Sequence, residues 1–367
     1  MGNSIKLFLC GDVMTGRGID QIMPYPSHPV LYERFVKNAY DYVELAMKKN
    51  GPFLPPVDFT YVWGNTIERM QQADLRIINL ETSITISNQH LQKGINYRMH
   101  PDNLPCLTSA NIDCCTLANN HVLDWGVDGL TETLDLLKKS GICYAGAGFH
   151  LKASKEHCRL NIPSKGGVLV FAYGLPSSGI PKEWQARSDR AGINMLNDLS
   201  ENNIRNIANE IKCNREPNEL IVVSIHWGEN WGYEIPESHK ELAHQLIDLE
   251  AADIIHGHSS HHFLGIEVYK NKPILYGCGD FINDYEGIGG YEKYRDDLGF
   301  MYFTESNPRN GQLISLQLVP TQMKNMRINS PENKDIKWMH STLNRECKKL
   351  KTNVEWLDGD IFNLVWN

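Results

Sequence analysis

Five short clusters of carboxylate, amide and imidazole side chains recur in this chain, each directly after a run of apolar, β-forming residues. The clusters read G-D-V-M at 11–14, N-L-E at 79–81, A-N-N-H at 118–121, H-W-G-E at 226–229 and H-G-H-S-S-H at 256–261. Uninterrupted apolar runs of this kind are typical of parallel strands buried on both faces. Because open α/β sheets place their chemistry beyond the strand ends, the pattern predicts an α/β fold with one shared site.

The overall composition is that of a globular protein, and it excludes several functions. Hydrophobic residues make up 41% of the 367 residues and charged residues 22%, which allows a sizeable core. The net charge of −8, with no Lys/Arg cluster, argues against a nucleic-acid partner. The apolar run at Leu7–Cys10 is too short for a signal-peptide core or a membrane span. Nine scattered cysteines without a C-x-x-C pair favour a reducing compartment, so we expect a cytoplasmic protein.

Strand and helix signals alternate as far as about residue 280 and then give way to shorter strand signals. We expect a main domain over residues 1–320, with an insertion at about 20–62 as a candidate lid, and a C-terminal appendage over 321–367 that packs through tryptophans. The strand signals at 265–269, 273–276, 298–303 and 313–319 predict a second, largely antiparallel sheet. Helices are predicted over 32–49, 63–72, 129–140, 199–212, 236–249 and 336–350, with Asp128 as the N-cap of the third.

Oxygen and imidazole donors that arrive together at strand ends indicate a metal site. Carboxylate, amide and histidine ligands without thiolate suit divalent ions, so we expect one or two ions of Mn, Mg, Ca, Fe or Zn. No pattern in the sequence ranks these metals or indicates an oligomeric state.

The order of the motifs resembles that of the CapA proteins, which are associated with poly-γ-glutamate capsule synthesis. The resemblance spans about residues 5–285 and includes G-D-V-M-T-G-R, N-L-E-T-S-I-T, A-N-N-H-V-L-D-W-G, Y-A-G-A-G, H-W-G-E, G-H-S-S-H and G-C-G-D-F. CapA proteins are a branch of the calcineurin-like metallophosphoesterase superfamily. The resemblance therefore implies a four-layer α-β-β-α sandwich, in agreement with the alternation of elements.

The resemblance also implies roles for individual residues. The implied metal ligands are Asp12, Glu81, Asn120, His226, His258 and His261. His121 is implied as the catalytic acid or base. Asp124 is expected either to orient that imidazole or to cap a helix. Supporting positions beside the ligands are expected for Asn119, His256, Glu229 and Asp280, whereas His262 is interpreted as a partly exposed loop residue.

Two positions near the first cluster bear on the chemistry. Met14 stands where metallophosphoesterases often carry a histidine ligand, and a thioether is a poor ligand for a hard cation. Arg17 lies in a glycine-flanked loop, where its guanidinium is expected either to bind a substrate carboxylate as part of the catalytic site or to form a surface ion pair.

Three functions fit these residues. The first is a CapA-like enzyme acting on a carboxylate-rich, polyglutamyl or peptide substrate, in which a metal activates water or polarises a carbonyl and His121 transfers protons. The second is a peptide Cα epimerase of a ribosomal-peptide pathway, which needs no nucleophilic water and tolerates Met14. The third is a phosphoesterase or a non-catalytic metal-binding protein. We expect the first and keep the epimerase as the main alternative.

Overall fold

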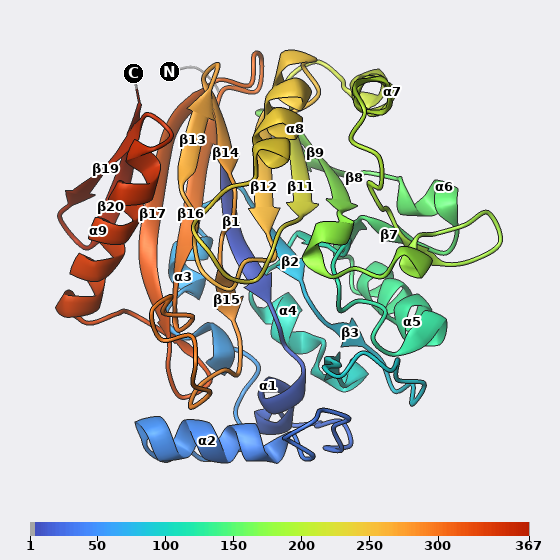
Figure 1. Ribbon diagram of the computed structural model, residues 1–367, viewed down its shortest axis with the longest axis vertical. Helices are drawn as coiled ribbons and strands as arrows, with labels where there is room; N and C mark the ends of the chain where they lie inside the picture. The colour runs from blue at the N-terminus through green and yellow to red at the C-terminus, as the bar shows by residue number, and fades with distance from the viewer. Residues whose placement is uncertain (1–3, 367) are drawn as a thin grey trace.

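The computed structural model describes residues 4–366, which form two β-sheets packed face to face with helices outside them (Figure 1). The larger sheet has ten strands. Eight of them follow the order β19 (Thr352–Leu357), β20 (Ile361–Trp366), β17 (Leu313–Met323), β16 (Leu298–Ser306), β1 (Ile5–Val13), β2 (Leu75–Leu80), β5 (Cys114–Thr116) and β6 (Cys143–Ala145). Off this path, β15 (Asp280–Ile282) pairs with β1, and β18 (Ile328–Asn329) pairs with β17.

The smaller sheet has six strands. Their order is β13 (Ile266–Tyr269), β14 (Lys272–Leu275), β12 (Ile254–His258), β11 (Glu219–His226), β9 (Gly166–Gly174) and β8 (Cys158–Ile162). The predicted second sheet of late strands is wrong, because β14 joins β12 in parallel whereas β16 pairs antiparallel with β1 of the larger sheet. Two further two-stranded pairs are β10 (Gly192–Ile193) with β7 (Ala147–Gly148), and β3 (Ser83–Ile84) with β4 (Arg98–Met99).

Alternate residues of the central strands enter different cores. In β1, Leu7 and Leu9 join the core between the two sheets, where Val222 and Ile254 of the smaller sheet also lie. Phe8 belongs to the core on the outer face of the larger sheet. Because both faces of β1 are buried, the run is apolar without alternation. A third core covers the outer face of the smaller sheet, so the predicted α-β-β-α sandwich is confirmed.

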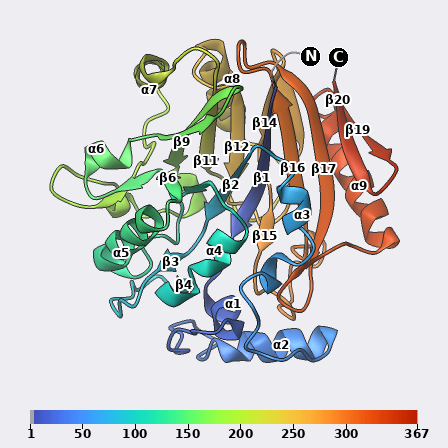
Figure 2. The same ribbon diagram turned by 180° about the vertical axis from the view of Figure 1, so that it is seen from behind.

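The bounds of the helices are α1 (Arg17–Ile22), α2 (Tyr40–Asn50), α3 (Ile67–Met70), α4 (Pro105–Ser109), α5 (Gly126–Lys139), α6 (Leu151–Ser154), α7 (Glu201–Asn214), α8 (Glu237–Asp248) and α9 (Asn333–Lys348). Helices α3, α4 and α5 pack on the outer face of the larger sheet, and α7 and α8 on that of the smaller sheet, whereas α1 and α2 lie below the strand ends (Figure 2). Short 3₁₀ turns lie at Tyr61–Trp63, Pro101–Asn103, Pro176–Ser178 and Lys182–Trp184. Asp128 lies in the first turn of α5 rather than at its cap, because the helix begins at Gly126.

The C-terminal residues add to the larger sheet. β20 pairs with β17, and α9 packs into the core between the sheets through Ile336, Met339 and Leu343. The insertion at 20–62 carries α2, whose Tyr42 and Val43 are buried in the outer core of the larger sheet. The predicted domain division at 320 and the lid role of the insertion remain predictions.

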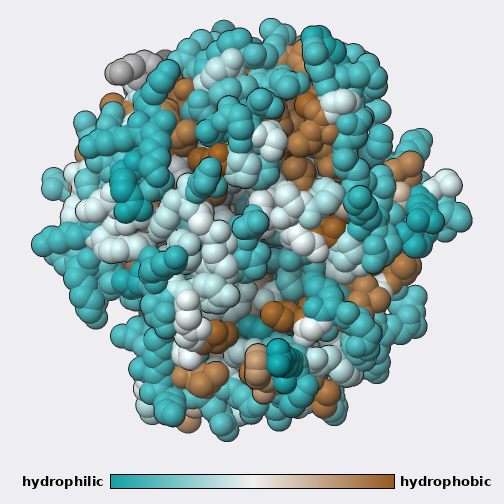
Figure 3. All heavy atoms as spheres, in the orientation of Figure 1, coloured by the Kyte–Doolittle hydropathy of each residue, from teal (hydrophilic) through white to brown (hydrophobic). Residues whose placement is uncertain are grey.

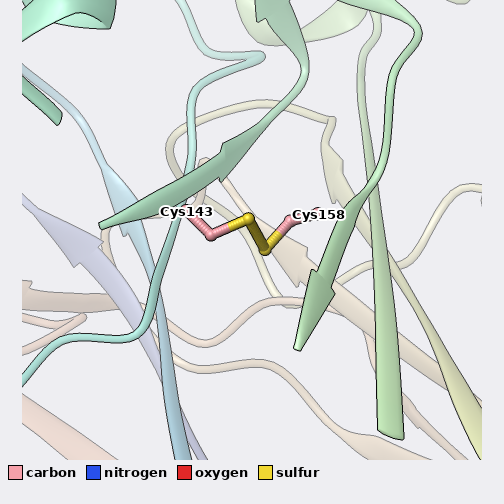
Figure 4. The surroundings of a disulfide bond; sticks show 2 residues. All are labelled: Cys143 and Cys158. Carbon is pink, nitrogen blue, oxygen red and sulfur yellow. A yellow bond between two sulfur atoms is a disulfide. The ribbon is translucent and has the colours of Figure 1, made fainter. Parts of the chain in front are cut away.

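A disulfide joins the two sheets at their edges (Figure 4). Cys143 of β6 and Cys158 of β8 have Cα atoms 5.8 Å apart and lie 15 residues apart in the sequence. The sequence carried no motif for this pairing, since the fold alone brings the two edge strands together.

The surface is mostly polar. Figure 3 shows hydrophilic residues over most of one face, with small separate hydrophobic patches. Across residues 4–366, every helix falls short of the length and apolar character that crossing a bilayer demands.

Candidate metal centre

Two groups of buried ligand side chains share Asp12. One group contains Asp12, His226 and His258, and the other contains Asp12, Glu81 and Asp280. Within each group the candidate ligand atoms lie within 4.8 Å of one another. Four of these five residues were predicted as ligands from the sequence, whereas Asp280 was expected only beside them.

The register of β1 explains why Asp280 reaches the centre. Asp12 is the parallel register partner of Asp280 on β15 and of Asn79 on β2. The ladder shifts register around Asp12, and the Asp12 amide donates to the Gly279 carbonyl over 2.9 Å. A Cβ on Gly11 would lie 1.6 Å from the Gly279 oxygen, so only glycine allows this approach. Gly11 therefore allows Asp12 to lie close to Asp280.

Three buried carboxylates in this space repel one another. Burial, and then the charge of Asp280, raise the pKa of Asp12 to about 7. Burial, and then the charges of Asp12 and Asp280, raise the pKa of Glu81 well above its ordinary value. Asp12 accepts hydrogen bonds from Asn79 Nδ2 over 2.7 Å and from the Ser259 amide over 3.2 Å. A divalent cation relieves this repulsion, so the donor set fits a hard metal ion.

The two histidines of the other group face each other. His226 Nδ1 and His258 Nδ1 are 2.7 Å apart, and Ser224 Oγ lies 2.8 Å from His258 Nε2. Asn120 Oδ1 lies 3.2 Å from His226 Nε2. Burial lowers the pKa of both imidazoles well below the ordinary value, which leaves them in the neutral form that binds metals. Asn120 is therefore placed to add an oxygen ligand on this side.

His121 lies at the rim of the centre with one nitrogen fixed. Its Nδ1 is 2.7 Å from Asp124 Oδ2, and its Nε2 is 3.9 Å from Glu81 Oε1. Lys93 Nζ donates to Asp124 Oδ1 over 2.8 Å and also to the Asn120 carbonyl. The Tyr97 ring stacks on His121 with centroids 3.9 Å apart. Asp124 thus orients the imidazole, one of the two roles expected for it.

The pKa of His121 is lowered to about 4, first because the ring is buried. Asp124 opposes this effect, and the nearby Lys93 charge adds to it. The ring is therefore neutral above this pH. With its Nδ1 proton donated to Asp124, the lone pair of Nε2 faces Glu81 and the metal ligands.

Asn119 and His256, which were expected beside the ligands, form hydrogen bonds with the segments that carry them. Asn119 Nδ2 donates to Asn79 Oδ1 and to the Leu80 carbonyl over 3.1 and 2.8 Å, and its Oδ1 accepts from the His121 amide over 3.1 Å. His256 Nε2 lies 2.7 Å from the Cys10 carbonyl. Both side chains are fully buried, and they orient the backbone that carries the ligands.

His261 lies apart from the two ligand groups. Its Nδ1 is 3.0 Å from Asp280 Oδ1, and its Nε2 is 2.9 Å from Asn230 Nδ2. Burial lowers the pKa of His261, but the charge and hydrogen bond of Asp280, together with the charges of Asp12 and Asp296, raise it overall. In this geometry His261 orients Asp280, and its role as a direct ligand remains a prediction. Its neighbour His262 is fully buried and accepts from the Gly232 amide over 3.1 Å, so the expectation of a partly exposed loop residue is wrong.

Met14 and Glu229 lie outside the ligand groups. Met14 is buried in the outer core of the larger sheet and takes no part in either group. Glu229 is exposed in the loop after β11 and lines a cavity there.

Arg17 is enclosed by acids and aromatic rings. Its Nε lies 2.9 Å from Asp284 Oδ2, its Nη1 lies 2.9 Å from Glu33 Oε1, and its side chain is 2% exposed. The guanidinium also lies 3.9 Å from the centroid of the Tyr42 ring. The ion pair joins α1 to the insertion and to the segment after β15. The alternative prediction for Arg17 was an ion pair at the surface. Arg17 does form an ion pair, but the prediction is wrong about its location, because the pair is buried. Binding of a substrate carboxylate by Arg17 remains a prediction and requires part of this network to open.

Several residues around the centre were not predicted from the sequence. Asn79 was visible in the N-L-E cluster, but its contact with Asp12 depends on strand register. Lys93 and Tyr97 lie in the loop between β3 and β4 and follow no strand, so they had no positional signal. The hydroxyls of Tyr97 and Tyr285 are 2.9 Å apart, and the Tyr285 ring meets His261 edge-on at 5.3 Å.

Comparisons with known proteins place the chain among capsule-synthesis relatives. A probable polyglutamine synthesis accessory protein of Mycobacterium tuberculosis is 41% identical over 98% of this chain and 96% of its own length. The capsule biosynthesis protein CapA of Bacillus anthracis is 26% identical over 83% of this chain and 64% of its own. The PGA biosynthesis protein CapA of Bacillus subtilis is 26% identical over 81% and 67%.

A crystal structure of a phosphatase from Mycoplasma pneumoniae is similar over 87% of this chain and 94% of its own, with 14% identity and a TM-score of 0.47. The profile of the family described as bacterial capsule synthesis protein PGA_cap matches residues 6–285. The chain belongs to this family of bacterial capsule synthesis proteins.

Proposed function

We propose that the protein is a CapA-type metal-dependent enzyme that acts on a carbonyl group of a carboxylate-rich peptide or polyglutamyl chain. The observation that carries this proposal is the pair of buried ligand groups sharing Asp12, with His121 Nε2 only 3.9 Å from Glu81 Oε1. A catalytic imidazole beside a metal-ligand cluster is the arrangement that proton transfer at a polarised carbonyl requires.

The ligands Asp12, Glu81, Asp280, His226 and His258, with Asn120 beside them, would hold one or two divalent ions. Such an ion supplies positive charge that polarises a carbonyl and increases the acidity of water or of a neighbouring C–H bond.

The chain's own residues carry the proton. Asp124 accepts a hydrogen bond from Nδ1–H of His121. The unprotonated Nε2 is therefore free to take a proton from the reacting group. Lys93 Nζ donates to the other oxygen of Asp124, which holds the carboxylate in place against the His121 ring. His121 then returns the proton to the leaving amine in hydrolysis. In epimerisation His121 keeps the proton that it removed, and a second acid or water protonates the α-carbon on its opposite face.

Epimerisation at Cα is the second candidate, and the loss of a histidine at Met14 favours it. One of the two ligand groups contains only the carboxylates of Asp12, Glu81 and Asp280. The neutral His121 is suited to remove a proton, and this reaction needs no activated water.

The products in D₂O distinguish the candidates. Protein loaded with Mn²⁺ is incubated with oligo-γ-glutamate, with peptides that have free C-termini and with a phosphate ester. New chain ends without Cα deuterium indicate hydrolysis, deuterium at Cα without cleavage indicates epimerisation, and phosphate release indicates a phosphoesterase. His121→Gln should reduce turnover by about 10²–10⁴-fold. His150→Gln, an exposed histidine at the start of α6, is the control. Tight metal binding with no product from any substrate would contradict the proposal.

A further inference from the structure

A cavity of about 600 Å³ opens beside the metal centre, at the loop that follows β11. Trp227, Trp231, His239 and Tyr276 line it. Trp227 packs in the core on the outer face of the smaller sheet, whereas the Trp231 ring lies 5.2 Å from the ring of His261, the partner of Asp280. The cavity is therefore linked to the candidate metal centre through Trp231 and His261, and the proposed function leaves it unexplained.

His239 is the residue in this cavity that points to a ligand. Its side chain is 5% exposed and stacks on Trp227 with centroids 4.5 Å apart. Among residues 4–366, neither of its ring nitrogens has a hydrogen-bond partner, although the other buried histidines all have one. Neither nitrogen is among the fully buried polar atoms that lack a partner, so the ring edge is open to the cavity, where its unprotonated nitrogen can accept a hydrogen bond from a bound group.

The walls and charges of the cavity select the kind of partner. Trp227 and Tyr276 stack with centroids 6.1 Å apart, and Trp227 Nε1 already donates to the Tyr276 carbonyl over 2.8 Å. The Trp227 face stacks on His239, and the Trp231 face stacks on Tyr291 with centroids 4.1 Å apart, so these rings pack against one another and form the wall of the cavity. Glu229 and Glu234 are exposed in the lining, which contains no Lys or Arg among the residues that the structure describes. Carboxylates in a lining without basic side chains favour a cation and repel an anion.

We propose that this cavity binds a cationic nitrogen group of the substrate, an ammonium or a guanidinium, while the metal centre acts on a neighbouring carbonyl. One N–H of that group donates to the unpaired ring nitrogen of His239. Its charge is paired by Glu229 and Glu234. That the cation belongs to the substrate rests on the proposed function, whereas binding of a cation in this cavity does not. The cation could be the amino terminus of a chain or a basic side chain.

Matched peptides separate these sources. Binding is followed by calorimetry for acetyl-Arg-Glu-Glu against acetyl-citrulline-Glu-Glu, and for free triglutamate against its acetylated form. At least one cationic member should bind about tenfold more tightly than its neutral partner. The preference should fall to near unity in Glu229→Gln/Glu234→Gln and in His239→Phe, which retains the aromatic stack. Glu241→Gln, an exposed glutamate on α8 outside the cavity, should leave it unchanged.

Equal binding within both pairs of peptides would overturn the proposal. Failure of both cationic peptides to bind would also overturn it, as would tighter binding of free indole than of the cationic peptides. The same titrations in Asp12→Asn separate the two proposals. If Asp12→Asn retains the cation preference and the wild-type protein shows no turnover, only the proposal of a metal-dependent enzyme is rejected. Turnover without any cation preference would reject the cavity proposal alone.

Discussion

Asp12 connects the two halves of the metal centre because its carboxylate belongs to both ligand groups. Its two oxygens already accept from Asn79 and Ser259, so the side chain is oriented before any ion binds. Preorganisation of this kind lowers the cost of binding, since little rotamer freedom is lost. At the residue scale, the centre therefore depends more on Asp12 than on any other ligand.

Acid should destabilise the protein through His239. Burial lowers the pKa of this ring from 6.5 to about 4, so the unfolded chain takes up a proton first as the pH falls. The stability contributed by the neutral ring is complete above about pH 6.5 and is lost as the pH falls from there towards 4. Between pH 7 and pH 5 this amounts to about 2 kcal/mol.

His239→Phe removes this titration and keeps the stack on Trp227. Urea unfolding at pH 7 and pH 5 should show a smaller pH-dependent loss in the variant than in the wild-type protein. An equal loss in both proteins would show that His239 titrates normally in the folded state.

Loss of the Arg17 guanidinium should be costly for folding. In Arg17→Met, Asp284 remains buried with 0% side-chain exposure and without its cation. We expect the free energy of unfolding to fall by about 3–5 kcal/mol in urea melts. Arg205→Met, which breaks an exposed pair with Glu201 on α7, is the control and should change little. Similar losses in the two variants would contradict the structural role of Arg17.

At the scale of elements, the sequence predicted where chemistry lies but not which side chains touch. Strand ends were recognisable from apolar runs followed by Asp, Glu, Asn or His, and these ends do converge. Asp280 could not be ranked as a ligand, because its contact depends on the pairing of β15 with β1 across 268 positions of sequence (280 − 12). Lys93 and Tyr97 come from a loop whose path is set by the β3–β4 pair rather than by local pattern.

The disulfide between β6 and β8 should stabilise the fold. It closes a loop of 15 residues between edge strands of the two sheets. Cross-linking a loop of this length restricts the unfolded chain by about 3 kcal/mol. The oxidised wild-type protein should therefore unfold at a higher urea concentration than the Cys143→Ala/Cys158→Ala variant. Addition of a reductant should lower the wild-type midpoint and leave that of the variant unchanged; a reductant without effect on either protein would contradict the pairing.

At the scale of the whole molecule, the candidate metal centre takes its side chains from both sheets. Asp12 and Glu81 come from β1 and the end of β2 in the larger sheet, whereas His226 and His258 come from β11 and β12 in the smaller one. An ion bound by both sets stabilises the packing of the sheets, because unfolding separates its ligands. The sandwich itself was predictable from the alternation of elements, but the assignment of the late strands to two different sheets was not.

Mn²⁺ should raise the melting temperature of the protein. At 100 times the dissociation constant, binding to the folded state alone adds about 2.7 kcal/mol. Thermal melts should therefore shift upward by several degrees with Mn²⁺ and return with a chelator. The same shift in Asp12→Asn would show that the ion stabilises the protein elsewhere.

The most direct test is the metal content of three variants, measured by elemental analysis after loading with Mn²⁺ and desalting. If both ligand groups bind ions, Asp12→Asn should lose all tightly bound metal, Asp280→Asn should lose only the carboxylate position, and exposed Asp189→Asn should match the wild type. A wild-type metal content in Asp12→Asn would contradict the claim that the two positions share this carboxylate.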